Sequence, residues 1–322
     1  MRIGFDLGGT KMLAAVLDDD NQTIGRAKTK TEGFGNDEIA GKIEEVIATA
    51  IDAAGVSAAQ ITAIGIAVPG LIDARRGIVL HTPNIGIRNL DLGARIRATF
   101  GSSALLCNDV NAGLWGEFVH GAARGYRHVV GVFPGTGIGG ALILNGGLYL
   151  GKSGGAGEVG HITVQSDGRV CGCGNYGCLE TVASKTALAR DLAVLAQSGR
   201  SATFAEAGAT DIKLVKSGLI KKAIDAGETL VADVLHRAAR FLGLGLAAMV
   251  NTFDPELVLL GGGLIEKLSD HIVPIAEQEM RQRAMPNLVG DVVLRTAQLG
   301  DNAVVVGAAD LAAHAQLSET RG

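Results

Sequence analysis

Two stretches of the chain, IGFDLGGTKMLAAVL at residues 3–17 and VGVFPGTGIGGALIL at residues 130–144, follow one pattern. Each starts with a short apolar run, passes through a turn containing glycine and threonine, and ends in a second apolar run. Apolar runs bounded by glycine are typical of β-hairpins. Because self-similarity within a chain indicates a repeated architecture, we predict two related halves, each with a glycine-rich hairpin. Two unrelated, ordinary hairpins are the alternative.

Elsewhere, short runs rich in valine and isoleucine alternate with helical patterns. Strands are predicted at residues 3–5, 14–17, 64–68, 105–107, 129–133, 141–144 and 256–260. Helices are predicted at residues 39–54 and 230–253, where apolar side chains recur at helical spacing. This alternation indicates an α/β fold.

Composition excludes several classes of protein. The chain has 322 residues, enough for two domains or one large one, and with 47% apolar and 19% charged residues it can bury a sizeable core. A net charge of −4 gives no basic footprint for nucleic acid. The longest apolar run, 241–250, is too short to cross a membrane, and no secretory signal is recognisable at the N-terminus. We therefore expect a cytoplasmic protein with neither a nucleic-acid nor a membrane partner.

The glycine turns have the chemistry of a phosphate site. In DLGGTK (6–11) an acid at a strand end precedes a turn without side-chain bulk, a hydroxyl group and an ammonium group. Backbone N–H groups in such turns can hold phosphate oxygens, and Asp6 could hold a metal ion through water. The turn at 135–140 and the glycines at 261–263 follow other predicted strands, and strand ends are where α/β sheets bind ligands.

Asn108 and Asp109 directly follow the predicted strand at 105–107. A carboxylate at a strand end is a candidate general base for a hydroxyl group. The alternative is that this Asn-Asp pair only caps the next helix.

Cysteines are rare and clustered. Cys171, Cys173 and Cys178 lie within eight residues, and His161 lies ten positions before the first of them. In a cytoplasmic protein such a cluster binds a metal more often than it forms disulfides. The alternative is four reduced side chains without a metal. Cys107, on an apolar strand, is interpreted as a small core residue.

Taken together, these motifs resemble those of the ROK sugar kinases, a family of bacterial glucokinases, N-acetylhexosamine kinases and related sugar-responsive repressors. The resemblance runs from Asp6 to about Gly307. It is carried by DLGGTK (6–11), VPG (68–70), TPN (82–84), NDVNA (108–112), GTGIGG (135–140), AGEVGH (156–161), CGCGNYGCLE (171–180) and LGGG (260–263).

The resemblance implies two actin-like ATPase (ribonuclease H-like) domains hinged around a central cleft. A small N-terminal domain would span residues 1–118, with a C-terminal helix at 303–322 packed back on it. A large domain with a zinc-binding loop would span residues 119–302. The family commonly forms homodimers, and we expect one here.

The resemblance also implies transfer of a phosphoryl group from ATP, with Mg²⁺, to the 6-hydroxyl group of a hexose, with Asp109 as catalytic base. By matching position, the sugar would contact Asn84, Asn108, Glu158, His161 and Glu180. The nucleotide would contact Asp6, Gly8, Gly9, Thr10, Lys11, Gly135, Thr136, Gly137 and Gly262. A structural Zn²⁺ would be held by His161, Cys171, Cys173 and Cys178.

The identity of the sugar is the most open point. Glucose is favoured, and an N-acetylglucosamine or N-acetylmannosamine kinase is the alternative. A DNA-binding repressor would carry a helix-turn-helix before DLGGTK, and the predicted strand starting at Ile3 leaves no room for one. A non-catalytic sugar sensor is the remaining alternative from another class.

Overall fold

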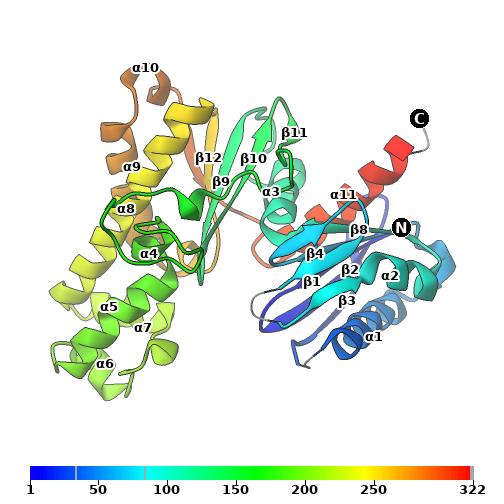
Figure 1. Ribbon diagram of the computed structural model, residues 1–322, viewed down its shortest axis with the longest axis horizontal. Coiled ribbons are helices and arrows are strands. Elements are labelled where there is room, and N and C mark those ends of the chain that lie inside the picture. The colour runs from blue at the N-terminus through cyan, green and yellow to red at the C-terminus, as the bar shows by residue number, and fades with distance from the viewer. Residues whose placement is uncertain (33–34, 83–84, 320–322) are drawn as a thin grey trace. The chain divides into compact units, whose positions relative to one another are not determined.

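The computed structural model describes residues 1–32, 35–82 and 85–319, with side chains through residue 315. The chain divides into two compact units (Figure 1). Unit 1 consists of Met1–Arg124 and Asp301–Gly322, and unit 2 of Gly125–Gly300. The domain boundary expected between residues 118 and 119 falls inside the helix α3 (Asp109–His120), and the observed boundary follows the end of that helix.

Unit 1 is built on a five-stranded sheet in the order β3-β2-β1-β4-β8 (Figure 1). Its strands are β1 (Arg2–Leu7), β2 (Lys11–Leu17), β3 (Thr23–Lys30), β4 (Ala63–Val68) and β8 (Ser103–Asn108). The first three are antiparallel neighbours, whereas β1, β4 and β8 run parallel. The parallel strands therefore all end at the same edge of the sheet.

Helices cover both faces of this sheet. On one face, Ile3, Phe5 and other alternate residues of the strands pack with the apolar side of α1 (Asn36–Ala54). On the other face, α11 (Asn302–Glu319) packs on β1 and β4 and beside α3. A Cβ at Gly4 would lie 1.7 Å from the carbonyl oxygen of Val305, so glycine is required for this close packing.

A second, three-stranded sheet lies within unit 1, in the order β5-β6-β7. Its strands are β5 (Leu71–Asp73), β6 (Ile78–His81) and β7 (Arg88–Asp91). The short helices η1 (Ala58–Gln60) and α2 (Leu92–Phe100) complete the unit.

Unit 2 repeats the topology of unit 1. Its sheet has the order β11-β10-β9-β12-β13, with an antiparallel β9–β10 hairpin and parallel pairing of β9, β12 and β13. The strands are β9 (Val129–Pro134), β10 (Ile138–Leu144), β11 (Gly147–Leu148), β12 (Leu257–Leu260) and β13 (Val293–Thr296). The β1–β2 and β9–β10 hairpins hold equivalent places in the two sheets, which confirms the predicted repeat.

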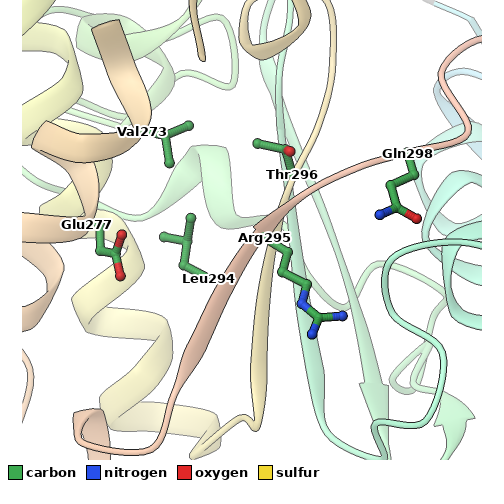
Figure 2. A pocket seen from close by; sticks show the side chains of 6 residues that line it. All are labelled: Val273, Glu277, Leu294, Arg295, Thr296 and Gln298. Atoms are coloured by element: carbon green, nitrogen blue, oxygen red, sulfur yellow. The ribbon is translucent and has the colours of Figure 1, made fainter. Parts of the chain in front are cut away.

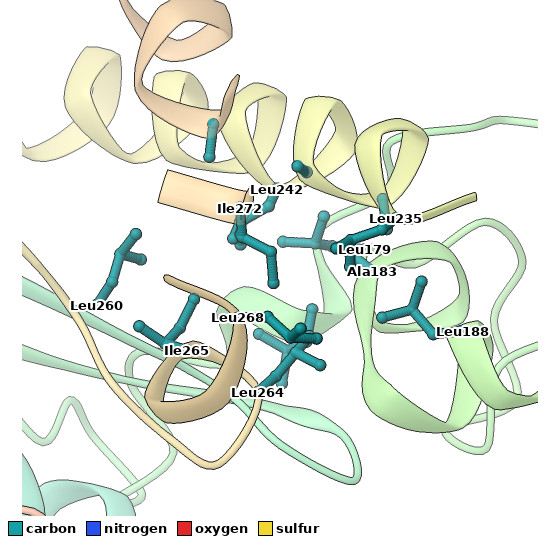
Figure 3. Packing of buried hydrophobic residues seen from close by; sticks show 14 of the residues in the cluster. Leu179, Ala183, Leu188, Leu235, Leu242, Leu260, Leu264, Ile265, Leu268 and Ile272 are labelled. Atoms are coloured by element: carbon teal, nitrogen blue, oxygen red, sulfur yellow. The ribbon is translucent and has the colours of Figure 1, made fainter. Parts of the chain in front are cut away.

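The helices of unit 2 form one large core with the sheet, and Figure 3 shows part of it, where Leu179, Leu242 and Leu264 pack together. The α-helices are α4 (Glu180–Ala183), α5 (Lys185–Gln197), α6 (Ala202–Glu206), α7 (Ser217–Asp225), α8 (Thr229–Phe253), α9 (Ile265–Arg283) and α10 (Pro286–Val289). Two short 3₁₀ helices are η2 (Val159–His161) and η3 (Ile212–Leu214). In the described part of the chain, no helix has the length and apolar character needed to span a membrane.

The α/β class is confirmed, and each predicted strand and helix lies at an observed one. Among the described strands, the predictions missed β3, β5, β6, β7, β11 and β13. In β3, the exposed Arg26, Lys28 and Lys30 alternate with residues that are small or only half-buried, so the apolar signal of a strand is weak.

Candidate active site and metal centre

The first glycine turn connects β1 to β2 in unit 1. The Gly8 amide donates to the carbonyl oxygen of Lys11 at 2.9 Å, which closes the turn. Thr31, the residue after β3, stabilises the turn, since its hydroxyl donates to the Gly8 carbonyl at 2.6 Å and its amide to the Thr10 carbonyl at 3.1 Å. Gly9 and Thr10 are exposed at the tip, where a ligand can reach them.

Two carboxylates come together at the edge of the sheet where β1, β4 and β8 end. Asp6 pairs with Ala67 of β4, and Asp109 follows β8, the next strand. Burial, reinforced by the negative charge of Asp109, raises the pKa of Asp6 from 3.8 to about 7, while the ammonium group of Lys11 opposes this shift. The two acids are thus close enough to repel each other.

Capping of helix α3 is performed mainly by Asn108. Its Oδ1 accepts hydrogen bonds from the amides of Val110 at 2.9 Å and Asn111 at 3.1 Å. Asp109, the first helical residue, is half-buried, and its Oδ1 accepts from the Val110 amide at 3.0 Å. The predicted helix cap is therefore real, and it leaves a carboxylate at the start of the helix, where the helix dipole favours negative charge.

Sequence reasoning missed Asp301, which contacts the first glycine turn. Its Oδ2 lies 2.5 Å from Nζ of Lys11 and 3.8 Å from Nζ of Lys28. The hydrogen bond from Lys11 lowers the pKa of Asp301 below its usual value. An Asp-Asn pair before an apolar helix is the only local sequence signal, and it does not reveal the partner.

The second glycine turn, between β9 and β10 of unit 2, is held by the start of α5. The Gly135 carbonyl accepts from the amide of Lys185 at 2.9 Å, and the Thr136 carbonyl accepts from the hydroxyl of Thr186 at 2.7 Å. A Cβ at Gly137 would lie 2.6 Å from Oε2 of Glu180, so glycine leaves room for that carboxylate. Gly137, which the sequence predicts to contact the nucleotide, therefore lies next to Glu180, which it predicts to contact the sugar.

Gly262 lies two residues after the end of β12 and has a φ of +83°, which favours glycine. A Cβ here would be 2.8 Å from the carbonyl oxygen of Pro134, the last residue of β9. The structure therefore places Gly262 beside the beginning of the second glycine turn.

The four proposed metal ligands converge in unit 2. The ligand atoms of His161, Cys171, Cys173 and Cys178 all lie within 4.8 Å of one another. The Cys173 and Cys178 sulfurs are 3.7 Å apart, and Nδ1 of His161 lies 3.6 Å from the Cys171 sulfur. Tetrahedral zinc, with bonds of about 2.3 Å to sulfur and about 2.0 Å to nitrogen, requires roughly 3.8 Å between sulfurs and roughly 3.5 Å between sulfur and nitrogen. The donor set and spacing therefore fit zinc.

Without a metal ion, the cysteine thiols differ in their tendency to ionise. Burial raises the pKa of the Cys171 thiol to about 12, and the thiol donates to Oε1 of Glu180 at 3.1 Å. Hydrogen bonding with the backbone at Asn175 lowers the pKa of the exposed Cys173. A bound metal ion would displace the remaining protons, since thiolates are the ligands.

The imidazole of His161 lies between two carboxylates. Its Nδ1, which faces Cys171, is 3.9 Å from Oε1 of Glu180, and its Nε2 is 3.8 Å from Oε2 of Glu158. Side-chain exposure is 67% for Glu158 and 24% for Glu180, so the cluster opens to solvent on the Glu158 side. One ring nitrogen therefore faces the metal ligands and the other faces an accessible acid.

Two glycines hold this histidine in place. A Cβ at Gly160 would lie 2.1 Å from the Ile138 carbonyl oxygen, and a Cβ at Gly140 would lie 2.5 Å from the Gly157 carbonyl oxygen. The segment leading to His161 therefore packs directly on the backbone of β10.

The remaining predicted residue, Asn84, lies outside the described residues. A separate pocket of unit 2, about 330 Å³ in volume, lies between α9 and β13 (Figure 2). Val273 and Glu277 line it from the helix, and the strand side is lined by Leu294, Arg295, Thr296 and Gln298. None of the residues singled out in the sequence lines this pocket.

The ROK family profile matches residues 2–315 of the chain. The chain belongs to the ROK family. This confirms the family predicted from the motifs. This ROK protein is 35% identical to the glucokinase of Streptomyces coelicolor over 316 residues, which are 97% of each chain. Its fold is similar to that of a ROK family glucokinase from Streptomyces griseus in complex with glucose and AMPPNP, with a TM-score of 0.82, 32% identity, and coverage of 97% of this chain and 99% of that chain.

Repressors are also among the similar ROK proteins. This chain is 34% identical to the xylose repressor of Bacillus spizizenii over 244 residues, which are 76% of this chain and 59% of the repressor. Membership of the family alone does not distinguish a kinase from a regulator, so the function must be argued from the residues of the site.

Proposed function

We propose that this ROK protein is an ATP-dependent sugar kinase that transfers the γ-phosphoryl group of ATP to the 6-hydroxyl group of a hexose, with glucose as the favoured sugar. The observation that carries the proposal is the carboxylate of Asp109, placed at the start of α3 beside Asp6 and the lysine-bearing glycine turn. The similarity to glucokinases along nearly the whole chain supports the choice of glucose.

Asp109 serves as the general base in this proposal. It accepts the proton of the 6-hydroxyl group while the hydroxyl oxygen forms a bond to the γ-phosphorus and the bond from that phosphorus to the ADP oxygen breaks. Placement at a helix N-terminus favours the ionised carboxylate that a base requires.

The glycine turns supply the phosphate contacts. The exposed Gly9 and Thr10, with Lys11, meet the outer phosphates from unit 1, and residues 135–137 with Gly262 form the corresponding elements of unit 2. Asp6 would hold Mg²⁺ through water, and that ion would neutralise phosphate charge. These residues fit a cation, because the carboxylates of Asp6 and Asp109 repel each other and a cation between them would stabilise both.

Sugar hydroxyl groups contact Glu158, His161 and Glu180 in this proposal, together with Asn84 and Asn108. The free Nε2 of His161 and the exposed Glu158 carboxylate form a donor and acceptor pair of the kind that recognises hydroxyl groups. Asn108 retains its amide NH₂ group as a donor, since helix capping uses its oxygen.

Zn²⁺ in this proposal is structural, held by His161, Cys171, Cys173 and Cys178. Three thiolates and one imidazole fill a tetrahedral set and leave no position for a reacting water. Its contribution is to stabilise the cysteine loop and the ring orientation of His161.

The test is an assay of ADP release by the purified, zinc-replete protein with Mg-ATP. Glucose, N-acetylglucosamine, N-acetylmannosamine, mannose and fructose are supplied separately. Turnover with glucose far above the rest is the expected result. If an N-acetylhexosamine is preferred, the proposed sugar is wrong but the proposed reaction stands. Absence of turnover with every sugar would contradict the proposed kinase activity.

A non-catalytic sugar regulator is the second candidate, favoured by the similarity to the xylose repressor. Titration calorimetry with the same sugars, and a gel shift with bulk duplex DNA, distinguish it. Sugar binding without ADP release would indicate the regulator.

A further inference from the structure

The contact between Lys11 and Asp301 joins parts of the chain that are far apart in sequence. The carboxylate oxygen Oδ2 of Asp301 lies 2.5 Å from the ammonium nitrogen of Lys11 and 3.8 Å from that of Lys28. Lys11 is the first residue of β2, directly after the glycine turn. Asp301 thus fixes the ammonium group next to the turn that is proposed to contact phosphate.

The position of Asp301 is itself set by a rigid element. Asp301 is the first residue of the segment that belongs to unit 1 after unit 2 ends, and α11 begins at the next residue. That helix packs against the sheet without space, because a Cβ at Gly65 would lie 1.9 Å from the Ala308 carbonyl oxygen. Its buried Asp310 also contacts Nε2 of His120 on α3 at 2.6 Å. Asp301 therefore lies at the N-terminal end of a helix whose position is fixed by close packing.

Stability alone does not account for this pair. The Lys11 and Asp301 side chains are 33% and 50% exposed, and ion pairs this accessible add little to folding. A lysine side chain is long and flexible, so its ammonium group has no defined location unless a partner holds it. Lys28 lies farther from the same carboxylate, at 3.8 Å, and its side chain is 53% exposed, so Lys11 is the cation that the carboxylate holds.

We propose that Asp301 is a positioning residue for phosphoryl transfer, which holds the ammonium group of Lys11 at the glycine turn where the outer phosphates of the nucleotide bind. This inference rests on the proposed function. Asp301 acts through Lys11 and needs no contact with the sugar. Its carboxylate stays ionised at neutral pH because the hydrogen bond from Lys11 lowers its pKa.

The experiment is a double-mutant cycle with Asp301→Asn, Lys11→Met and the double variant in the full chain. Asp301→Asn is expected to lower kcat/KM for ATP about tenfold, because a displaced reacting group costs one to two orders of magnitude. The KM for the sugar stays within about twofold, since only transition-state and nucleotide contacts change. The double variant is expected to be no worse than Lys11→Met, because both changes remove one interaction.

Lys28→Met is the matched control, since it removes a second, more distant cation near the same carboxylate, and its kcat/KM is expected to stay within about twofold. Asp301→Glu should recover part of the activity, which separates positioning from misfolding. Effects of Asp301→Asn and Lys11→Met that multiply, or an Asp301→Asn enzyme equal to wild type, would overturn the proposal.

Failure of the proposed function gives a different result. If the wild-type protein turns over no sugar, the affinity of the wild type and the three variants for Mg-ATP is measured instead by titration calorimetry. Non-additive weakening of nucleotide binding by the two changes then supports the role of Asp301, and additive or absent weakening refutes it.

Discussion

Asp109 begins α3, yet the cap of that helix does not depend on it. Asn108 supplies two hydrogen bonds to the first turn, so Asp109→Asn should preserve the fold. We expect kcat to fall about 10³-fold, since general bases contribute two to four orders of magnitude. Sugar affinity should change less than about tenfold, because the base acts in the transition state. Assays of ADP release and sugar calorimetry measure both.

Asp19→Asn is the control for that experiment, because Asp19 is an acid of unit 1 whose side chain is 98% exposed. It should leave kcat unchanged. An Asp109→Asn enzyme with near-wild-type turnover would remove Asp109 from the role of base.

The carboxyl group of Asp6 makes stability depend on pH. Its pKa is raised from 3.8 to about 7, mainly by burial and then by Asp109, so the folded protein resists ionisation that the unfolded chain undergoes freely. Ionisation of Asp6 therefore lowers the free energy of unfolding of the wild-type protein as the pH rises from about 4 to about 7. Asp6→Asn removes the penalty, and its stability relative to wild type should increase by about 3 kcal/mol between about pH 5 and pH 8.

Urea unfolding of both proteins in EDTA at several pH values measures this difference, because groups other than Asp6 cancel between the two. A difference that is constant with pH would show that Asp6 is not buried and protonated in the folded protein. In the same variant, activity should require more Mg²⁺ than in wild type.

At the scale of elements, the cysteine loop depends on its four ligands. We expect about one zinc per wild-type chain and most of it lost in Cys171→Ser, because three ligands hold a structural ion poorly. Sugar binding should weaken with it, since the loop positions His161. Elemental analysis of metal content and thermal unfolding provide the measurements.

Cys107→Ala is the matched control, because this fourth cysteine lies on β8 in a different unit. It should retain its zinc despite a small loss of core packing. Wild-type protein with far less than one zinc per chain would contradict the metal site.

The 3₁₀ helix η2 depends on close contact with β10. Gly160→Ala would place a Cβ 2.1 Å from the Ile138 carbonyl oxygen, and the backbone must move to relieve this contact. We expect a loss of about 1–3 kcal/mol of stability, typical of overpacking. The KM for the sugar should rise about tenfold, because small displacements of positioned groups are costly, while the KM for ATP changes little.

Gly155→Ala is the control for this change, since its Cβ would meet nothing closer than 3.8 Å. It lies in the same connection but should leave both KM values near wild type. Equal effects of the two substitutions would show that the contact with β10 does not position His161.

At the scale of the whole molecule, unit 2 is continuous in sequence and unit 1 is not. A fragment of residues 125–300 contains the complete core of unit 2 and all four proposed zinc ligands. We therefore expect it to fold alone, bind about one zinc and show no ADP release. Circular dichroism with thermal unfolding and metal analysis check this, and an unfolded or zinc-free fragment would contradict it.

The corresponding fragment 1–124 should not fold alone. Without α11, the buried Leu13, Ala15 and Leu17 on one face of the sheet lose the helix that covers them. Addition of residues 301–322 by a linker should restore a cooperative unfolding transition.

Much of the architecture could be read from the sequence because its signals are local. The glycine turns at 8–11 and 135–137, the hairpins around them, and the clustering of Cys171, Cys173 and Cys178 all lie within short segments. β-Strand alternation and helical spacing arise from neighbouring residues, so these predictions hold whatever surrounds them. The polar edge strand β3 was missed because its charged residues face solvent and mask that alternation.

Contacts between distant segments were decided only by the tertiary structure. Nothing in the local sequence pairs Lys11 with Asp301, because their separation is set by the packing of α11 on β1 and β4 through Gly4 and Gly65. In the same way, which nitrogen of His161 faces the cysteines follows from the packing of η2 on β10. A hydrogen bond or a metal–ligand contact forms only within a few ångströms, and the packed backbone determines which groups lie within that distance.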